Sequence, residues 1–381
     1  MNNINSVNDI QRNILGWFST HGRHWIPWKL NQDRSLPKSG ESISPYGIWI
    51  AEIMLQQTQL KVVMPYWKKW MKTFPNLKVL ADGDENDVLL EWQGLGYYSR
   101  AKRIFKSSKI LINLIGQDQF LDPLMWPVEL DAWMTLPGVG RTTAGSIISS
   151  AFDMPAPILD GNVKRILSRL DASNTTPRSD ERRLWKLSSQ LLPINNPRNF
   201  NQALMDLGSL VCTIRNPSCC SCPLQNYCLA YIKYDPNNFP KKDMKQNIPT
   251  KEIGIGIVFN KQGKLLIDQR PEGSNMGGMW EFPGGKKESS ESIPETIERE
   301  INEELGIEIK VGKKLVSFTH AYSHMKLHFT VHICTWISGI PKPLASKKVL
   351  WVAPTQLCDF PFPAANTKII KKLDKYLAIE K

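Results

Sequence analysis

The strongest constraint on the fold is a change in the character of the chain after Tyr231. Apolar residues recur at helical spacing before this point, whereas residues 231–250 are polar and basic and contain three prolines, which is typical of a linker. Strand-like stretches begin beyond the linker. Because 381 residues exceed one ordinary hydrophobic core, the sequence predicts a multidomain protein. We expect an all-α domain over residues 1–230 and an α+β domain over residues 251–381.

Apolar periodicity predicts where the elements lie. Ile10, Ile14 and Phe18 predict a first helix that ends at Gly22, and a second helix is expected over residues 48–63, ended by Pro65. Further helices are expected near residues 85–92, 100–115, 141–152, 162–170, 181–192, 200–211 and 292–305. Strands are expected near residues 253–260, 264–270, 314–319, 326–337 and 348–352.

The net charge of the chain indicates which class of molecule it binds. The net charge of +12 favours a polyanion such as nucleic acid, since lysine and arginine side chains that face phosphates release counterions. No apolar run reaches the roughly eighteen residues that span a membrane. The polar N-terminal stretch also lacks the apolar core of a signal peptide. We therefore expect no membrane partner and a cytoplasmic location.

Five of the seven cysteines fall between Cys212 and Cys228. Cys212, Cys219, Cys222 and Cys228 have the spacing C-x6-C-x2-C-x5-C, with Cys220 as a spare neighbour. In a cytoplasmic chain such clustering favours a metal site over disulfides. Four thiolates on short loops suit either a four-iron cluster or a tetrahedral zinc ion.

The stretch "LPGVGRTTAGSIIS" (136–149) predicts a helix-hairpin-helix motif. Gly138 and Gly140 permit a tight turn, and the helix that follows offers free N–H groups to a phosphate. This geometry holds a DNA backbone without reading bases. Shortly after it, "ILDGNVKR" places Asp160 and Lys164 one helical turn apart, although Asp160 could also be only a helix N-cap.

Four features together resemble the helix-hairpin-helix DNA glycosylases, and among them the MutY-type adenine DNA glycosylases. They are Glu52 in "AEIMLQQTQ", the hairpin, the acid in "LDGNVKR" and the cysteine spacing. The resemblance covers nearly the whole chain. It implies a monomeric base excision repair enzyme on the bacterial nucleoid, which removes adenine mispaired with 8-oxoguanine or guanine in double-stranded DNA. It also implies a [4Fe–4S] cluster on the four cysteines and a domain with an iron-sulfur loop at residues 212–228.

The resemblance assigns chemistry to two carboxyl groups. Glu52 lies in an apolar run, so its pKa should be raised and it can donate a proton to the leaving adenine near neutral pH. Asp160, when ionised, would stabilise the oxocarbenium-like sugar. Related endonuclease III enzymes carry a nucleophilic lysine in the hairpin where this chain has Thr142, so we expect monofunctional hydrolysis. Lys164 could still trap an opened sugar, but it is not expected to be the nucleophile.

Other residues are implied to contact DNA. Arg23 and Trp28 in "GRHWIPWKL" match a segment near the adenine pocket. Gln56, Gln57 and Tyr97 match the DNA wedge, where a flat amide or ring fills the space left by a flipped base. Without the resemblance, the glutamines would be interpreted as a solvated helix face.

The C-terminal domain resembles MutT-type Nudix hydrolases, and in this family it reads 8-oxoguanine. Tyr322, Ser323 and His324 match the loop that contacts the lesion. The chain also has an unbroken Nudix box, which consists of Gly285, Glu291, Arg299, Glu300, Ile301, Glu303, Glu304, Gly306 and Ile307. Glu300, Glu303 and Glu304 share one helix face and could hold Mg²⁺ for a separate hydrolysis of nucleotides such as 8-oxo-dGTP. The alternative, which we favour, is an inherited scaffold whose acids form ion pairs.

Overall fold

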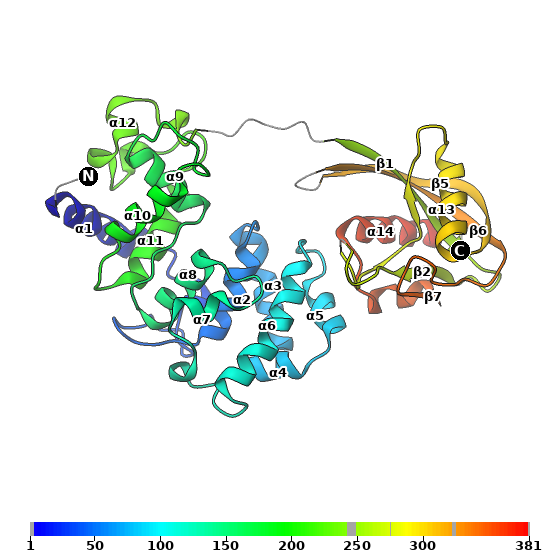
Figure 1. Ribbon diagram of the computed structural model, residues 1–381, viewed down its shortest axis with the longest axis horizontal. Coiled ribbons are helices and arrows are strands. Elements are labelled where there is room, and N and C mark those ends of the chain that lie inside the picture. Colours follow the sequence, from blue (N-terminus) through cyan, green and yellow to red (C-terminus); the bar gives the residue numbers. More distant parts are fainter. Residues whose placement is uncertain (1–3, 242–248, 275, 322–324, 380–381) are drawn as a thin grey trace. The chain divides into compact units, whose positions relative to one another are not determined.

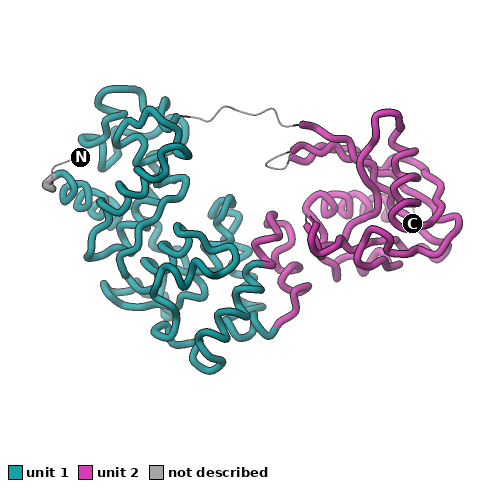
Figure 2. Tube along the Cα trace, viewed as in Figure 1, with its two compact units in different colours: residues 1–82, 103–244 teal, residues 83–102, 245–381 magenta. Residues whose placement is uncertain are grey.

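The structure is a computed structural model that describes residues 4–241, 249–274, 276–321 and 325–379 (Figure 1). Its chain divides into two compact units (Figure 2). The first comprises residues 1–82 and 103–244, and the second comprises residues 83–102 and 245–381. Each unit is described separately below.

The segment Gly83–Lys102 differs from the expected domain boundaries, because it groups with the C-terminal unit and not with the helical one. The Tyr98 hydroxyl donates a hydrogen bond of 3.1 Å to the Phe362 carbonyl oxygen. Lys102 Nζ lies 2.7 Å from a Glu272 carboxylate oxygen. These contacts join residues far apart in the sequence, so periodicity along the chain could not have predicted them.

The first unit consists of helices. Its α-helices are α1 (Ile4–His21), α2 (Pro45–Leu55), α3 (Leu60–Thr73), α4 (Leu77–Asp82), α7 (Leu130–Met134), α8 (Arg141–Phe152), α9 (Gly161–Leu170), α10 (Glu181–Leu191), α11 (Pro197–Leu210) and α12 (Leu229–Lys233). Short 3₁₀ helices are η1 (Pro27–Lys29), η2 (Pro123–Met125), η3 (Cys219–Ser221), η4 (Gln225–Tyr227) and η5 (Pro236–Asn238), and α6 (Ser99–Ile115) spans the division between the units. Helix α11 packs against α1, α8 and α9, while α2 packs against α8. This packing brings α2, α8 and the start of α9 to one place.

The helix expected over residues 48–63 is wrong in its extent. Helix α2 ends at Leu55, and α3 begins at Leu60 after a turn. Gln57 has a φ of +58°, a left-handed conformation that reverses the chain, and apolar spacing continues across this turn and conceals it. Pro65 lies inside α3 and does not end a helix. A proline there costs about 3 kcal/mol, which the burial of residues such as Trp70 on the same helix offsets.

The second unit is built on one mixed sheet of seven strands among its described residues. The strands are β1 (Thr250–Phe259), β2 (Leu265–Gln269), β3 (Trp280–Glu281), β4 (Gly284–Lys286), β5 (Glu308–Ala321), β6 (Lys326–Ser338) and β7 (Lys348–Val352). Their order is β3-β2-β1-β6-β5, with β4 paired to β1 and β7 paired to β2. Strands β1 and β6 are parallel, and the other pairs are antiparallel.

Helices cover both faces of this sheet (Figure 1). Helix α13 (Ile293–Leu305) packs Ile297 and Ile301 against Val258 and its neighbours on one face. Helix α14 (Ala364–Ile379), which periodicity had not predicted, packs Ile369 against the opposite face. Helix α5 (Glu85–Trp92) and the 3₁₀ helix η6 (Pro354–Asp359) complete the unit. The fold class, an all-α domain joined to an α+β domain, is therefore confirmed.

None of the helices in the described part of the chain is both long and apolar enough to cross a membrane.

Candidate active site

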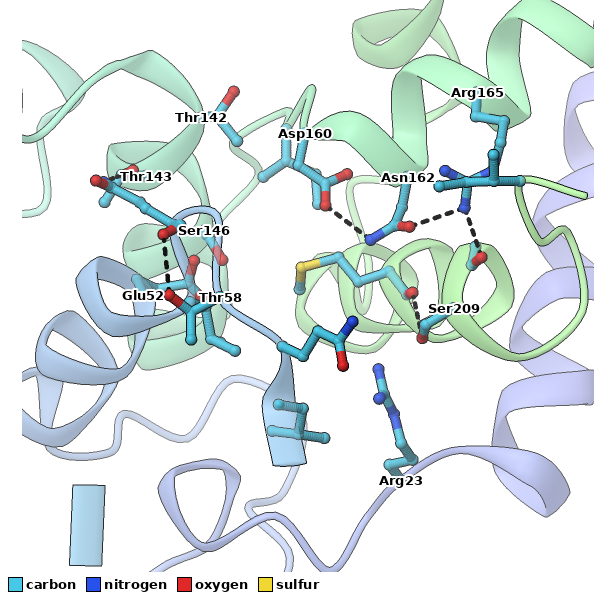
Figure 3. A pocket seen from close by; sticks show the side chains of 18 of the residues that line it. Arg23, Glu52, Thr58, Thr142, Thr143, Ser146, Asp160, Asn162, Arg165 and Ser209 are labelled. Atoms are coloured by element: carbon cyan, nitrogen blue, oxygen red, sulfur yellow. Dashed lines mark hydrogen bonds between the residues drawn. The ribbon is translucent and has the colours of Figure 1, made fainter. Parts of the chain in front are cut away.

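A pocket of about 710 Å³ opens in the helical unit (Figure 3). Its size lies within the roughly 300–1,000 Å³ typical of small-molecule sites. Five side chains predicted from the sequence line it, namely Arg23, Glu52, Gln56, Thr142 and Asp160. These come from the segment after α1, from α2 and its following turn, from α8 and from the start of α9. Residues separated by more than a hundred positions in the chain thus share one cavity.

Glu52 has the electrostatics of a proton donor. Burial raises the pKa of its carboxyl to about 7, and the charge of Asp160 reinforces this. A hydrogen bond from the Ser146 hydroxyl and the positive charge of Lys29 oppose the increase in pKa (Figure 3). Part of the Glu52 surface remains exposed to the pocket. The carboxyl is therefore accessible to a ligand, yet held largely away from bulk water.

Asp160 is both the N-cap of α9 and a pocket residue. Its Oδ1 accepts the Val163 backbone N–H at 2.8 Å, and its Oδ2 accepts a hydrogen bond from Asn162 Nδ2 at 3.0 Å. Burial raises the pKa of its carboxyl, while these hydrogen bonds lower it. The helix N-terminus also favours the ionised form. The N-cap interpretation and the catalytic interpretation are therefore compatible.

A second layer of contacts fixes Asp160. Arg165 Nη2 donates to Asn162 Oδ1 at 2.8 Å and to the Gly208 carbonyl oxygen at 2.6 Å (Figure 3). Gly208 of α11 lies so close to α9 that an added Cβ would stand 2.5 Å from Asn162 Cβ. The chain of contacts from Arg165 through Asn162 to Asp160 therefore needs glycine at position 208.

The segment after α1 contributes a buried ion pair beside the pocket. Arg23 Nη2 lies 2.6 Å from Asp206 Oδ1, and the Arg23 backbone N–H donates to Asp206 Oδ2 at 2.7 Å. Lys29 Nζ lies 3.7 Å from the same carboxylate. Trp28 does not line this pocket as expected; its ring packs against Trp67, and it lines a separate cavity. Arg23 therefore remains the candidate from this segment.

The hairpin adjoins the pocket through α8. Gly138 has a φ of +85°, and an added Cβ would lie 3.0 Å from Arg103 Cδ, so glycine is required there. Gly140 is the N-cap of α8 and has open space where a Cβ would be, so a ligand backbone can approach it. Gln56 Nε2 donates to the Gly138 carbonyl oxygen at 3.2 Å. The turn after the Glu52 helix is thus fastened to the hairpin.

Gln57 and Tyr97, the other residues expected at the DNA wedge, lie in different units. Gln57 is exposed with a φ of +58°, and Tyr97 is 47% exposed with a φ of +51°. A left-handed backbone conformation costs a residue other than glycine about 1–2 kcal/mol. Residues with a strained backbone conformation are concentrated at functional sites.

The contacts of Lys164 argue against a role as the nucleophile. Its Nζ lies 2.8 Å from Glu181 Oε1, and it is not among the residues that line the pocket. Thr142, by contrast, lines the pocket at the hairpin position.

The four predicted cysteine ligands line one small cavity together with Arg169. Arg169 Nη1 donates to Cys212 Sγ at 3.2 Å, and burial raises the pKa of the Cys222 thiol to about 12. Four half-buried thiols that share one cavity form a typical iron or zinc donor set. No three His, Cys, Asp or Glu side chains in the described ranges already form a group at metal-binding geometry. The fit therefore rests on the donor set and its common cavity.

The glutamates of the Nudix box form ion pairs. Arg299 lies 3.0 Å from a Glu303 oxygen and 3.2 Å from a Glu300 oxygen, and it also bonds to Glu291. Burial raises the pKa of Glu304 to about 7, reinforced by the charges of Glu300 and Glu281. Within the described residues these acids form no ready metal group. Glu291, Glu300 and Glu303 are thus engaged by Arg299 as ion pairs.

Tyr322, Ser323 and His324 lie outside the described residues. The strands on either side of them carry an ordered polar cluster. His328 Nε2 lies 3.0 Å from Ser317 Oγ, and His328 Nδ1 lies 3.0 Å from Thr319 Oγ1.

Sequence reasoning missed four residues of the site: Ser146, Asn162, Arg165 and Asp206. Asn162 and Arg165 follow Asp160 within the stretch "LDGNVKR", so that motif contained them. Ser146 follows Thr142 by one turn of α8, a spacing that places both on one face. No local signal marked Asp206.

The geometry described above agrees with the matches to known proteins. Residues 50–190 match the HhH-GPD superfamily of base excision DNA repair proteins, and residues 254–372 match the NUDIX domain. A solved structure of a thermostable thymine-DNA glycosylase, at 24% identity and a TM-score of 0.50, covers 60% of this chain and 97% of its own, and it supports the fold. The chain is thus a DNA glycosylase of the helix-hairpin-helix class with a Nudix domain.

Two similar proteins narrow the assignment. The adenine DNA glycosylase of Buchnera aphidicola subsp. Schizaphis graminum is 38% identical over 71% of this chain and 73% of its own length. The adenine DNA glycosylase of Homo sapiens is 31% identical over 76% of this chain and 60% of its own length. The chain belongs to the adenine DNA glycosylase family, which confirms the resemblance seen in the sequence.

Proposed function

We propose that this adenine DNA glycosylase hydrolyses the N-glycosidic bond of adenine paired with 8-oxoguanine or guanine in duplex DNA, acting as a monomer. One observation carries the proposal. Glu52, whose pKa is about 7, and Asp160, whose carboxyl oxygens accept two hydrogen bonds, line one pocket of about 710 Å³. Two carboxyl groups of different protonation are what cleavage of a glycosidic bond requires. Both come from one chain, so the site needs no partner subunit.

Glu52 is the general acid in this proposal. Adenine is a poor leaving group as an anion, so its ring nitrogen must gain a proton as the bond to the sugar breaks. With a pKa of about 7, Glu52 is protonated in about half of the molecules at neutral pH. The base reaches the carboxyl only after it is flipped out of the duplex.

Asp160 is the electrostatic partner. Its ionised carboxylate stabilises the positive charge that develops on the sugar. Asn162 donates a hydrogen bond to one of its oxygens and the Val163 amide donates to the other, so the carboxylate is held in place before the reaction begins.

The reaction is proposed to be monofunctional. Thr142 supplies no amine at the hairpin position, and Lys164 is engaged by Glu181. A Schiff base with the opened sugar needs a free amine at the sugar carbon. Lys61 lies at the exposed pocket rim, so borohydride trapping of a covalent complex is the direct check.

Duplex binding is proposed to involve the hairpin and the two left-handed residues. Gly140 leaves space for a phosphate at the start of α8, whose N–H groups and dipole attract anions. Gln57 and Tyr97 are exposed and flat, so either can occupy the space left by a flipped base. Arg23 is proposed to approach the adenine from the pocket wall.

Recognition of 8-oxoguanine is proposed for the loop Tyr322, Ser323 and His324, on the resemblance alone. The flanking strands β5 and β6 support this placement, because Ser317, Thr319 and His328 give them an ordered polar surface. Hydroxyl and imidazole groups can bond to the altered purine edge.

The four cysteines are proposed to hold a [4Fe–4S] cluster. When bound, such a cluster joins the thiolates of Cys212, Cys219, Cys222 and Cys228 and stabilises the loop that carries them. Arg169 orders this loop, since it also donates to the Thr213 carbonyl oxygen at 2.7 Å.

The test uses end-labelled duplexes that carry A:8-oxoG, A:G, A:C or A:T, followed by alkaline cleavage of abasic sites. Strand cleavage at A:8-oxoG well above A:T is expected. The Glu52→Gln variant should lose it, whereas Glu129→Gln, at an exposed carboxyl on the same unit, should not. Excision by Glu52→Gln at the wild-type rate would remove Glu52 from its role, and no cleavage of any duplex by the wild-type protein would refute the function.

A further inference from the structure

A second concave surface lies beside the hairpin in the helical unit. It is formed by the first residue of α8, the turn before α10, and α10 itself, and we call it the α8–α10 groove. Its lining is strongly basic and includes Arg141, Arg178, Arg182, Lys186 and Trp185. It is separate from the pocket that holds Glu52, with which it shares no lining residue.

Most positive charges of this groove have no acidic partner in the part of the chain that the structure describes. Within the described residues, no carboxylate forms an ion pair with Arg178, Arg182 or Lys186. The one acid in the lining, Glu181, already lies 2.8 Å from Lys164 Nζ. Like charges gathered on one surface repel each other, so the arrangement favours an anion from outside the protein.

One of these cations is held in a fixed orientation. The Arg141 guanidinium lies over the Trp185 ring, 4.1 Å from its centroid. Stacking on an aromatic face fixes the plane of a guanidinium while its N–H groups at the edge stay available to a phosphate. Arg182 and Lys186 lie one turn apart on α10, about 6 Å along the helix axis. The groove therefore offers several cations in a row.

The groove adjoins the pocket that holds Glu52 through two elements. In the first turn of α8, Arg141 lines the groove while the next residue, Thr142, lines the pocket. In α9, Asp160 lies at the N-terminus by the pocket, and Lys164, one turn later, pairs with Glu181 of the groove. A polyanion that enters the pocket with one nucleotide therefore passes next to these cations.

We propose that the α8–α10 groove binds phosphates of the DNA backbone, on the same duplex whose adenine enters the pocket. The inference rests on the proposed function for the identity of the duplex. It extends the binding surface beyond the hairpin backbone to a set of side chains on α10. Such contacts position the enzyme on DNA without reading bases.

The test is the salt dependence of duplex binding by the full-length protein. In the triple variant Arg178→Ala, Arg182→Ala, Lys186→Ala, the slope of log affinity against log salt should become less steep by about 2 to 3, because each phosphate that the protein no longer neutralises reduces it by about 0.9. Affinity should fall equally for an A:8-oxoG duplex and an undamaged one. The excision rate at saturating enzyme should stay within about twofold of the wild type, because the pocket is untouched.

The matched control is Lys371→Ala, Lys372→Ala, Lys375→Ala on α14, which removes the same charge from exposed positions elsewhere. Its slope should equal that of the wild type. A groove variant with an unchanged slope in an enzyme that still excises adenine would overturn the inference, as would an equal change in the control. If the wild-type protein excises no adenine, the proposed function fails instead, and the slope still measures the groove. The single variant Arg182→Ala, with an expected change of about 1, serves if the triple variant unfolds on heating earlier than the wild type.

Discussion

Burial of Glu52 predicts that the free energy of unfolding depends on pH, because its carboxyl destabilises the fold at high pH. Below its ordinary value of 4.5 the carboxyl is protonated in both the folded and unfolded states, so the stability of the fold is fully present. As the pH rises towards the folded value of about 7, the unfolded chain ionises first and stability is lost. Each pH unit in this window corresponds to about 1.4 kcal/mol, so the loss amounts to about 3 kcal/mol.

The perturbation is Glu52→Gln, which keeps the shape of the side chain and cannot ionise. The variant should have nearly the wild-type stability at about pH 4 and exceed it by about 3 kcal/mol at about pH 8. For a unit of this size that difference raises the melting temperature by roughly 6 to 12 °C. The assay is thermal unfolding of both proteins followed by far-ultraviolet circular dichroism at the two pH values.

The control is Glu129→Gln, in which an exposed carboxyl of the helical unit is changed in the same way. Its melting temperature should track the wild type at both pH values. If the advantage of Glu52→Gln is the same at low and high pH, the carboxyl is not held protonated by burial, and its assignment as the general acid loses its physical basis.

Four further outcomes follow from the site. The single-turnover excision rate should fall about tenfold per pH unit above about 7 as Glu52 ionises. Ser146→Ala should move this decrease to higher pH, because it removes a hydrogen bond that lowers the pKa of Glu52. A rate that does not change with pH would contradict both predictions. Asp160→Asn should keep the helix cap, since asparagine caps as well as aspartate, and should lower excision about 10²-fold or more; a comparable rate would exclude the electrostatic role. Cys222→Ser should lower the bound iron and the visible absorption of the purified protein, whereas unchanged iron would argue against the predicted ligand set. With Mg²⁺, 8-oxo-dGTP should stay intact, and hydrolysis that is lost in Glu303→Gln would show instead that the Nudix box is active.

Local spacing in the sequence predicted the elements that carry the site. The hairpin glycines, the acid after "IL" and the cysteine spacing each lie within a short stretch of the chain, the longest being residues 212–228. Their structural context could therefore be inferred from the sequence. Strands β1, β2, β6 and β7 and helix α13 of the Nudix domain followed from alternation and periodicity in the same way. What these patterns share is that the interacting residues are neighbours in the chain.

The contacts that complete the site could not be inferred in this way. Asp206 reaches Arg23 from 183 positions away, and a lone aspartate in an amphipathic helix looks like an ordinary surface residue. Apolar periodicity did not predict the turn after Leu55, because Leu60 and Val63 continue the apolar spacing of α2. Trp28 was assigned from its place in a motif, but tertiary packing against Trp67 directs it to another cavity.

The left-handed conformations of Gln57 and Tyr97 have a consequence for the evolution of the sequence at these two positions. Glycine would relieve the backbone at either position, by about 1–2 kcal/mol before the entropy that glycine loses on folding. A selection for stability alone would therefore drift towards glycine there and discard the side chain. On the proposal that both side chains contact DNA, the glutamine and the tyrosine are places where the chain has a less stable residue for the sake of its substrate. Searches for thermostable variants should find improvements at these two positions, with weakened action on DNA as the accompanying loss.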